Sequence, residues 1–316
     1  FGNPEDMVID GTNKFIIPVA QVGEQTFYTF AEAAAVAQAG SEIILLANIE
    51  GGITVPANVT LNGNGFAISG AITADGTITF AGVTKAGNFS VKNVNTVVNI
   101  PAGASLQLTG SGRMVIGHGC TFNITGSIAD NAAKTIDKAT LTPSLVMPGA
   151  SFTGAGVTFN VTNAYIKTTA SYCSSSKSAS STFDFDIKNS IWEQFGKLAF
   201  ESQSVNATVN FDLVNSVLTT TSHLVFGVSR GEVVIDNSNV NVGTSRQIEN
   251  QSTMTIKNGS VVNGAVAASS NAKNPGTLIV DNATYAVTGE FSGSDLGTGT
   301  LIVNKTANFS AGSITK

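Results

Sequence analysis

The chain has 316 residues and a net charge of −5, with 42% hydrophobic and only 12% charged residues. This composition excludes a disordered, highly charged chain. Because the 16 basic residues form no run of Lys or Arg, it also excludes nucleic acid as a partner bound through its phosphates. No stretch approaches the ~20 apolar residues of a membrane-spanning helix, so we expect no transmembrane segment.

Residues 1–50 do not follow the repeat that governs the rest of the chain, and we expect them to form an N-terminal cap of strands and one helix. Thr29 and Glu32 have the spacing of a capping box at the start of an Ala-rich stretch. This predicts a helix over residues 30–39, which a glycine follows. The apolar run at residues 42–47 predicts a buried strand.

Short strands are predicted from residue 53 to residue 124. Gly or Asn lies between most of them, as expected for turns. The chain shows no alternating pattern of helices, which excludes a βαβ architecture. The predicted strands cover residues 53–55, 59–61, 66–68, 78–80, 89–91, 97–100, 106–108, 114–116 and 122–124.

Two polar segments interrupt the strands and predict projecting loops. The first, residues 126–151, combines charged residues with Pro143 and Pro148, and the second, residues 169–181, is rich in Ser. Long loops on a rigid scaffold are common places for binding sites.

The two cysteines, Cys120 and Cys173, could form one disulfide. We favour two free thiols, because the residues lie in different types of segment and a free Cys often behaves as a small buried hydrophobe.

A hydrophobic strand motif recurs through the C-terminal half with steps of 26, 26, 22, 21, 24 and 23 residues. Such a period indicates one supersecondary unit stacked on itself. The sequence therefore predicts an all-β chain, a single-stranded parallel β-helix over residues 51–316 that is continuous with the cap. We expect the mid-strand residues to be buried and stacked in register, as at Phe185, Phe211, Ile235 and Ile256. The aligned positions near the strand ends are Val161, Ile187, Leu213, Ile235, Ile256, Val280 and Val303.

An Asn follows most copies of the motif by two residues, from Asn163 to Asn282. We predict a structural role for this column, because Asn tolerates the left-handed backbone conformation at a turn and stacked Asn side chains hydrogen-bond to one another.

The beginning of the chain also resembles a known superfamily. The segments Tyr28-Thr29-Phe30-Ala31-Glu32-Ala33-Ala34, Ile43-Ile44-Leu45-Leu46-Ala47-Asn48-Ile49 and Val59-Thr60-Leu61-Asn62-Gly63-Asn64-Gly65 are similar to the capping helix and first coil of right-handed parallel β-helix proteins of the pectin-lyase-like superfamily. More narrowly, the chain looks like secreted or surface-anchored bacterial members described as adhesin-like. The similarity covers roughly residues 26–70 by motif and the rest by periodicity. It implies a right-handed coil and an extracellular or cell-surface location, but fold does not imply activity.

One strand carries an outward acidic row, with Asp184 and Asp186 followed by Lys188. Asp212 aligns with Asp186 one coil later, about 4.8 Å away in a parallel stack. We interpret the row as a solvated surface without catalytic function. The alternative comes from the resemblance, since polysaccharide lyases of this fold hold calcium with outward carboxylates. It would make the three Asp residues calcium ligands and Lys188 or Arg230 the base.

Aromatic residues near this row could bind sugar rings by stacking. We predict a ligand-binding surface between residues 165 and 215 that contains Trp192, Tyr172, Asp186 and Asp212. Gly117-His118-Gly119 is similar to a short motif of polygalacturonase-like glycosidases, but the other segments of that motif are missing, so we interpret it as a turn.

The leading hypothesis is a non-enzymatic β-helix that serves as a structural or adhesive module and binds a glycan or a host or cell-surface protein without a cofactor. Because the chain starts at Phe1, we expect that a leader has been removed. One alternative is a polysaccharide lyase or glycosidase, with calcium as the cofactor of the lyase. A second alternative is a segment of a phage tail or an autotransporter-like passenger.

Overall fold

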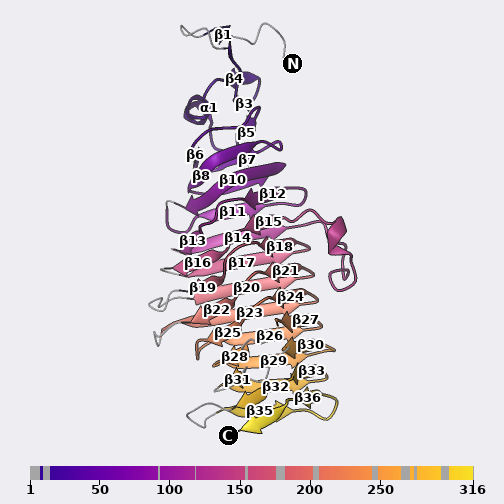
Figure 1. Ribbon diagram of the computed structural model, residues 1–316. Coiled ribbons are helices and arrows are strands. Elements are labelled where there is room, and N and C mark those ends of the chain that lie inside the picture. The colour runs from indigo at the N-terminus through magenta and orange to yellow at the C-terminus, as the bar shows by residue number, and fades with distance from the viewer. Residues whose placement is uncertain are drawn as a thin grey trace.

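The computed structural model (Figure 1) describes residues 8–9, 15–91, 93–117, 119–153, 156–175, 182–201, 206–243, 248–264, 271–273, 276–292 and 299–315. The chain winds into an elongated parallel β-solenoid, with the N-terminal cap at one end and the last coil at the other. From the middle of the chain onward, each coil contributes one strand to each of three parallel stacks. The predicted all-β parallel solenoid with a short N-terminal helix is confirmed.

The first stack continues from one end of the solenoid to the other, and neighbouring strands in it pair in parallel. Its strands are β5 (Glu42–Leu45), β7 (Val59–Asn62), β9 (Ile78–Ala81), β11 (Val97–Ile100), β14 (Cys120–Thr125), β17 (Val157–Thr162), β20 (Thr182–Lys188), β23 (Thr208–Val214), β26 (Glu232–Asp236), β29 (Thr253–Lys257), β32 (Thr277–Asp281) and β35 (Thr300–Val303).

The second and third stacks form the other two faces. The second contains β12 (Ser105–Leu108), β15 (Leu145–Met147), β18 (Tyr165–Thr168), β21 (Ile191–Gln194), β24 (Val217–Thr220), β27 (Asn239–Val242), β30 (Val261–Gly264), β33 (Thr284–Val287) and β36 (Asn308–Ser310). The third contains β13 (Met114–Gly117), β16 (Ala150–Thr153), β19 (Cys173–Ser175), β22 (Leu198–Glu201), β25 (Leu224–Gly227), β28 (Ile248–Asn250), β31 (Asn271–Lys273), β34 (Glu290–Ser292) and β37 (Ser313–Thr315).

In the first coils these two faces are joined by long strands. β6 (Ile53–Pro56) pairs with β8 (Ala67–Asp75), which pairs with β10 (Val83–Val91). β10 pairs with β12 near its start and with β13 at Ser90, so one strand bends through both faces. Only parts of β8 and β10 were predicted, because most of their remaining residues are small or polar.

The N-terminal end of the solenoid is covered. α1 (Phe30–Val36) packs against β6 and β3 (Ala20–Val22), and β3 pairs antiparallel with β5 and with β4 (Gln25–Phe27). The predicted capping box is confirmed, since the Glu32 amide donates to Thr29 Oγ1 at 3.2 Å and the Thr29 amide donates to Glu32 Oε2 at 3.0 Å. The predicted end of the helix at residue 39 is wrong, because Ala37 already has extended backbone angles. A separate antiparallel pair, β1 (Val8–Ile9) and β2 (Phe15–Ile16), precedes this cap.

One continuous hydrophobic core runs through the coils. Phe185 and Phe211 pair in register, with ring centroids 5.9 Å apart, as predicted. The predicted column from Val161 to Val303 is confirmed, and Ile235 pairs with Leu213 in it. Ile235 is buried, but its grouping with Phe211 as a mid-strand residue is wrong, because Val233 pairs with Phe211.

The first projecting loop ends earlier than predicted. It occupies residues 126–144 and includes the 3-10 helix η2 (Lys138–Thr140), and we call it the insertion loop. Figure 1 shows it beside β15 and β18. Residues 145–147 belong to β15 and residues 150–151 to β16. The two prolines that suggested a loop lie next to these strands rather than within them.

A strand lies within the second predicted loop. Cys173–Ser175 form β19, and residues 176–181 lie outside the described residues. Cys120 and Cys173 are buried and not bridged, which confirms the two free thiols. Among the described residues, no helix has the length and apolar character needed to span a membrane.

Candidate functional site

The Asn column is structural, as predicted. The residues have left-handed φ angles between +44° and +56°, and they stack at the turn that follows the first stack. Asn189 donates to Asn163 at 2.7 Å, Asn215 to Asn189 at 3.5 Å and Asn237 to Asn215 at 3.1 Å. The members of the column are Asn163, Asn189, Asn215, Asn237, Asn258 and Asn282.

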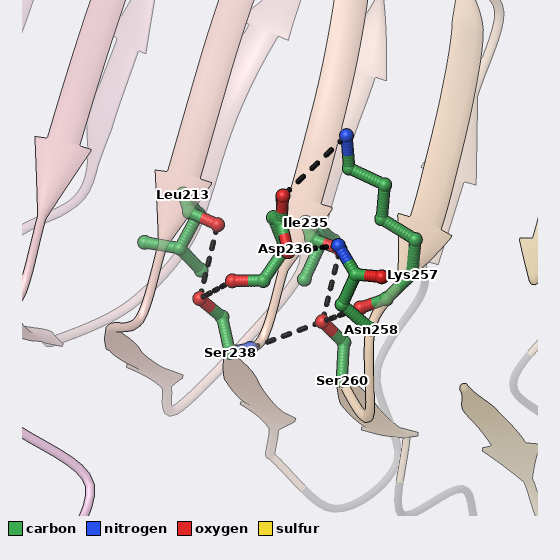
Figure 2. A network of polar contacts seen from close by, with 7 residues as sticks. All are labelled: Leu213, Ile235, Asp236, Ser238, Lys257, Asn258 and Ser260. Carbon is green, nitrogen blue, oxygen red and sulfur yellow. Dashed lines mark hydrogen bonds and ion pairs between the residues drawn. The ribbon is translucent and has the colours of Figure 1, made fainter. Parts of the chain in front are cut away.

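A second column, of serines, lies inside the same turn and was not predicted. The amides of Ser190, Ser216 and Ser238 each donate to the hydroxyl of the Ser in the next coil at 2.9 to 3.0 Å. Figure 2 shows Ser238, whose hydroxyl lies 2.7 Å from the Asp236 carbonyl and 3.0 Å from the Leu213 carbonyl. The sequence signal was the Asn-Ser dipeptide that recurs three times, followed by Asn258-Gly259-Ser260. The members are Ser190, Ser216, Ser238 and Ser260, all fully buried.

Two members of the acidic row lie side by side. Asp186 pairs in register with Asp212, as predicted, and Val234 follows in the next coil. Lys188 binds Asp186 at 2.6 Å. Burial raises the pKa of Asp212 above its usual value, and the carboxylate of Asp186 raises it further.

The predicted calcium cluster is not assembled. Asp184 is two residues from Asp186 on the same strand, and its neighbour in the next coil is Asn210, which donates to it at 2.7 Å. Within the described part of the chain, no three His, Cys, Asp or Glu side chains gather where they could hold a metal ion. The lyase alternative proposed two residues as the base. Lys188 forms an ion pair with Asp186, and Arg230 lies two residues before the first residue of β26.

Trp192 does not belong to the predicted binding surface. Its side chain is fully buried, and its ring centroid lies 6.0 Å from that of Phe185. Trp192 pairs with Ile166 and Leu218 in the second stack, where this position points into the core. Alternation within the first stack does not determine which residues point inward on the next face, so the prediction placed the ring on the wrong side.

Tyr172 is 40% exposed, but it lies away from the acidic row. It precedes β19 in the third stack, whereas Asp186 and Asp212 are on the first. The Arg113 guanidinium carbon lies 4.3 Å from the centroid of the Tyr172 ring, and the Lys197 nitrogen lies 5.4 Å from it. The predicted binding residues therefore do not form one surface.

The insertion loop lies along the Asn column across several coils. Asn163 donates to Asp130 at 3.3 Å, and Asn189 donates to the Ala129 carbonyl at 2.8 Å. Further contacts join Asn215 to Asn131 at 2.8 Å and Lys134 to Asn237 at 2.5 Å. The side chains of the column thus hold the loop on the solenoid.

A small apolar cluster fixes the same loop. Ile128 and Ala133 of the loop pack with Tyr165 of β18 and Ile191 of β21. Ile136 and Leu141 cover this cluster. Because apolar contacts and hydrogen bonds act together, the loop is a defined part of the surface.

A cleft of about 510 Å³ lies between the insertion loop and the second stack. Lys167 and Glu193 face it from neighbouring strands of the stack. Lys138 from the loop and the hydroxyl of Tyr165 both bind Glu193. The cleft residues are Asp137, Lys138, Ala139, Leu141, Pro143, Tyr165, Lys167 and Glu193.

The polar groups in this cleft shift the pKa values of Glu193 and Tyr165. Burial would raise the pKa of Glu193, but the hydrogen bonds from Lys138 and Tyr165 and the charges of Lys138 and Lys167 outweigh burial, so this pKa lies below its usual value. Burial raises the pKa of Tyr165 above its usual value, and the Glu193 carboxylate raises it further. Glu193 is therefore ionised and Tyr165 protonated over the physiological pH range.

Comparisons with models of protein families, with curated proteins and with solved structures find no match for this chain. His118 of the Gly-His-Gly segment lies outside the described residues.

Proposed function

We propose that this chain is a non-catalytic β-solenoid module of a secreted or cell-surface protein that binds a glycan or a protein segment. The cleft beside the insertion loop is the observation that carries the proposal. Its walls come from a rigid stack and from a loop held by the Asn column, so its groups are positioned before a ligand arrives. The polar, lysine-poor composition and the resemblance to adhesin-like β-helix proteins support an extracellular location.

The chemistry of the cleft favours binding over catalysis. A general acid must hold a proton near neutral pH, and a general base must be able to accept one. The pKa of Glu193 is lowered and the pKa of Tyr165 is raised, so both pKa values are shifted away from neutral pH. Two lysines, two carboxylates, a phenol and the apolar Leu141 and Pro143 instead offer hydrogen bonds, charge and apolar contact to a hydroxyl-rich or mixed polar ligand.

The test is to screen the purified chain on arrays of glycans and matrix proteins, beside a variant in which a Gly-Ser linker replaces residues 129–141. We expect the parent chain to bind a limited set of ligands and the variant to lose them while it keeps its β-sheet circular dichroism. Absence of binding by the parent chain contradicts the proposal. Calcium-dependent release of unsaturated products from acidic polysaccharides, abolished by Asp186→Ala, would instead support the lyase alternative.

A further inference from the structure

A row of residues lies at the turn that leads into the third stack, one residue from each coil. Figure 1 shows the strands that follow this turn, β13, β16, β19, β22 and β25, stacked along one side of the solenoid. The first amide of a strand donates to the carbonyl of the row residue in the next coil, at 2.8 to 3.3 Å. The row consists of Arg113, Gly149, Tyr172, Lys197 and His223.

Gly149 leaves a gap in this row, and the side chain of Arg113 extends past it. The Arg113 guanidinium carbon lies 4.3 Å from the centroid of the Tyr172 ring, two coils away. Its Nη1 donates to Ser174 Oγ at 3.2 Å in the coil of Tyr172. A Cβ added at Gly149 would lie only 2.8 Å from the Tyr172 carbonyl oxygen, so the backbone itself requires the gap.

The guanidinium is held in place, yet most of its donors are available. A guanidinium has five N–H donors. Within the described part of the chain, Arg113 donates only to Ser174 and forms no ion pair. Lys197, whose nitrogen lies 5.4 Å from the Tyr172 ring, is instead paired with Glu201 at 3.0 Å. Because a positioned guanidinium can donate two parallel hydrogen bonds to one carboxylate, Arg113 is suited to bind a carboxylate ligand.

The surroundings of Arg113 favour a protein partner over a sugar. Arg113 covers one face of the Tyr172 ring, so this face cannot stack on a sugar ring. Val115 is 56% exposed and Phe195 is 47% exposed. Gly196, the neighbour of Phe195, lies against Tyr172. An exposed combination of Arg, aromatic and aliphatic side chains is typical of the energetically important part of protein interfaces.

The apolar residues lie on either side of the guanidinium along the solenoid axis. Val115 is in the coil two steps before Tyr172, and Phe195 precedes the strand of the coil one step after it. Three steps of ~4.8 Å span about 14 Å, which is the length of about four residues of an extended peptide. A short extended segment therefore reaches from one apolar residue to the other.

We infer that this surface, which we call the Arg113 patch, binds an acidic segment of a partner protein. One Asp or Glu carboxylate of the segment binds the Arg113 guanidinium, and apolar side chains on either side of it contact Val115 and Phe195. The patch lies on the third stack, whereas the cleft lies between the insertion loop and the second stack. The inference therefore does not depend on the proposed function. The patch consists of Arg113, Val115, Tyr172, Phe195 and Lys197.

The test measures binding of the fluorescein-labelled peptide Leu-Leu-Glu-Glu-Leu-Leu by fluorescence anisotropy. In an extended peptide each face then carries one Glu between two Leu. We expect saturable binding by the full chain, and binding weaker by at least about tenfold when Gln replaces both Glu. Arg113→Gln should lose about as much, and Arg113→Lys should also weaken binding, because Lys cannot form two parallel hydrogen bonds to one carboxylate.

Two controls test the location of the site. Lys85→Gln removes a cation from β10, where Lys85 pairs with Gln107 of the second stack, and should bind like the parent chain. The cleft variant Lys138→Gln with Lys167→Gln should also keep its affinity for the peptide, which separates this result from the proposed function. If Arg113→Gln fails to fold, Phe195→Glu decides, because it keeps Arg113 and should weaken binding by repelling the peptide.

Three results would overturn the inference. They are no saturable binding by the parent chain, equal affinity for the Glu and Gln peptides, and unchanged affinity in a folded Arg113→Gln variant. Tighter binding of an oligogalacturonate than of the Glu peptide, lost in the same variant, would assign the patch to an acidic glycan instead of a protein.

Discussion

Asp186 and Asp212 lie directly opposite each other on β20 and β23, yet Lys188 forms an ion pair with only one of them, Asp186. The structure therefore places two carboxylates side by side on a rigid face, and burial together with Asp186 raises the pKa of Asp212. Charge on Asp212 therefore opposes folding.

Stability should therefore depend on pH through Asp212. A carboxyl whose pKa is raised by folding favours the native state below its unfolded pKa, near 3.9, and this contribution is lost as pH rises through the folded pKa. The Asp212→Asn variant should match the parent chain near pH 3 and exceed its stability at pH 7. Urea unfolding at both pH values measures this. Equal stability of the two chains at pH 7 would show that the carboxylate is not destabilising.

The stacked phenylalanines should dominate the core. Phe211 is buried, and its ring lies 5.9 Å from Phe185 and 5.2 Å from Phe226. Phe211→Ala should reduce the free energy of unfolding by ~3 to 5 kcal/mol, because it removes apolar contacts and leaves a cavity. Chemical denaturation measures this, and a loss below ~1 kcal/mol would show that the column is not the core.

At each turn of the Asn column, both the left-handed backbone conformation and the Asn side chain should contribute to stability. Asn215 has φ +51° and donates to Asn131 and Asn189. Asn215→Gly loses only the side-chain hydrogen bonds, whereas Asn215→Ala also forces an unfavourable conformation. The Ala variant should be less stable than the Gly variant by roughly 1 kcal/mol. Thermal unfolding of the pair distinguishes the effects, and the opposite order would contradict this account.

The buried Ser column should contribute to stability at every coil. Ser238→Ala removes the acceptor of the buried Ser216 amide, so it should reduce stability by ~1 to 3 kcal/mol. Ser229→Ala, at an exposed position, is the matched control and should have little effect. Comparable losses in both variants would mean that the column is not specifically stabilising.

Several features could be predicted from the sequence because each depends on local chemistry. The capping box needs only Thr29 and Glu32, and the left-handed turns need only the Asn. The register of Asp186 with Asp212 followed from alternation within aligned strands of equal length. Counting back from the Asn column also gave the register of Ile235 with Leu213, whereas grouping the mid-strand residues wrongly placed Ile235 beside Phe211.

The sequence predicted the loop that forms one wall of the candidate site but not the cleft itself, because the cleft depends on contacts between distant segments. Trp192 follows a turn, and the inward direction on the new face depends on how the chain bends there. Lys138 and Glu193 are 55 residues apart, and their contact depends on the path of the insertion loop over the Asn column. Alternation of polar and apolar residues carries no information about that path.

The most direct test compares the cleft with the acidic row as the place where a ligand binds. One variant combines Lys138→Gln with Lys167→Gln in the cleft, and the matched variant combines Asp186→Asn with Asp212→Asn on the other face. For a ligand found on the arrays, we expect the cleft variant to lose at least about tenfold in affinity, or ~1.4 kcal/mol, and the matched variant to bind like the parent chain. Loss of affinity in the acidic-row variant, with unchanged binding by the cleft variant, would contradict this account.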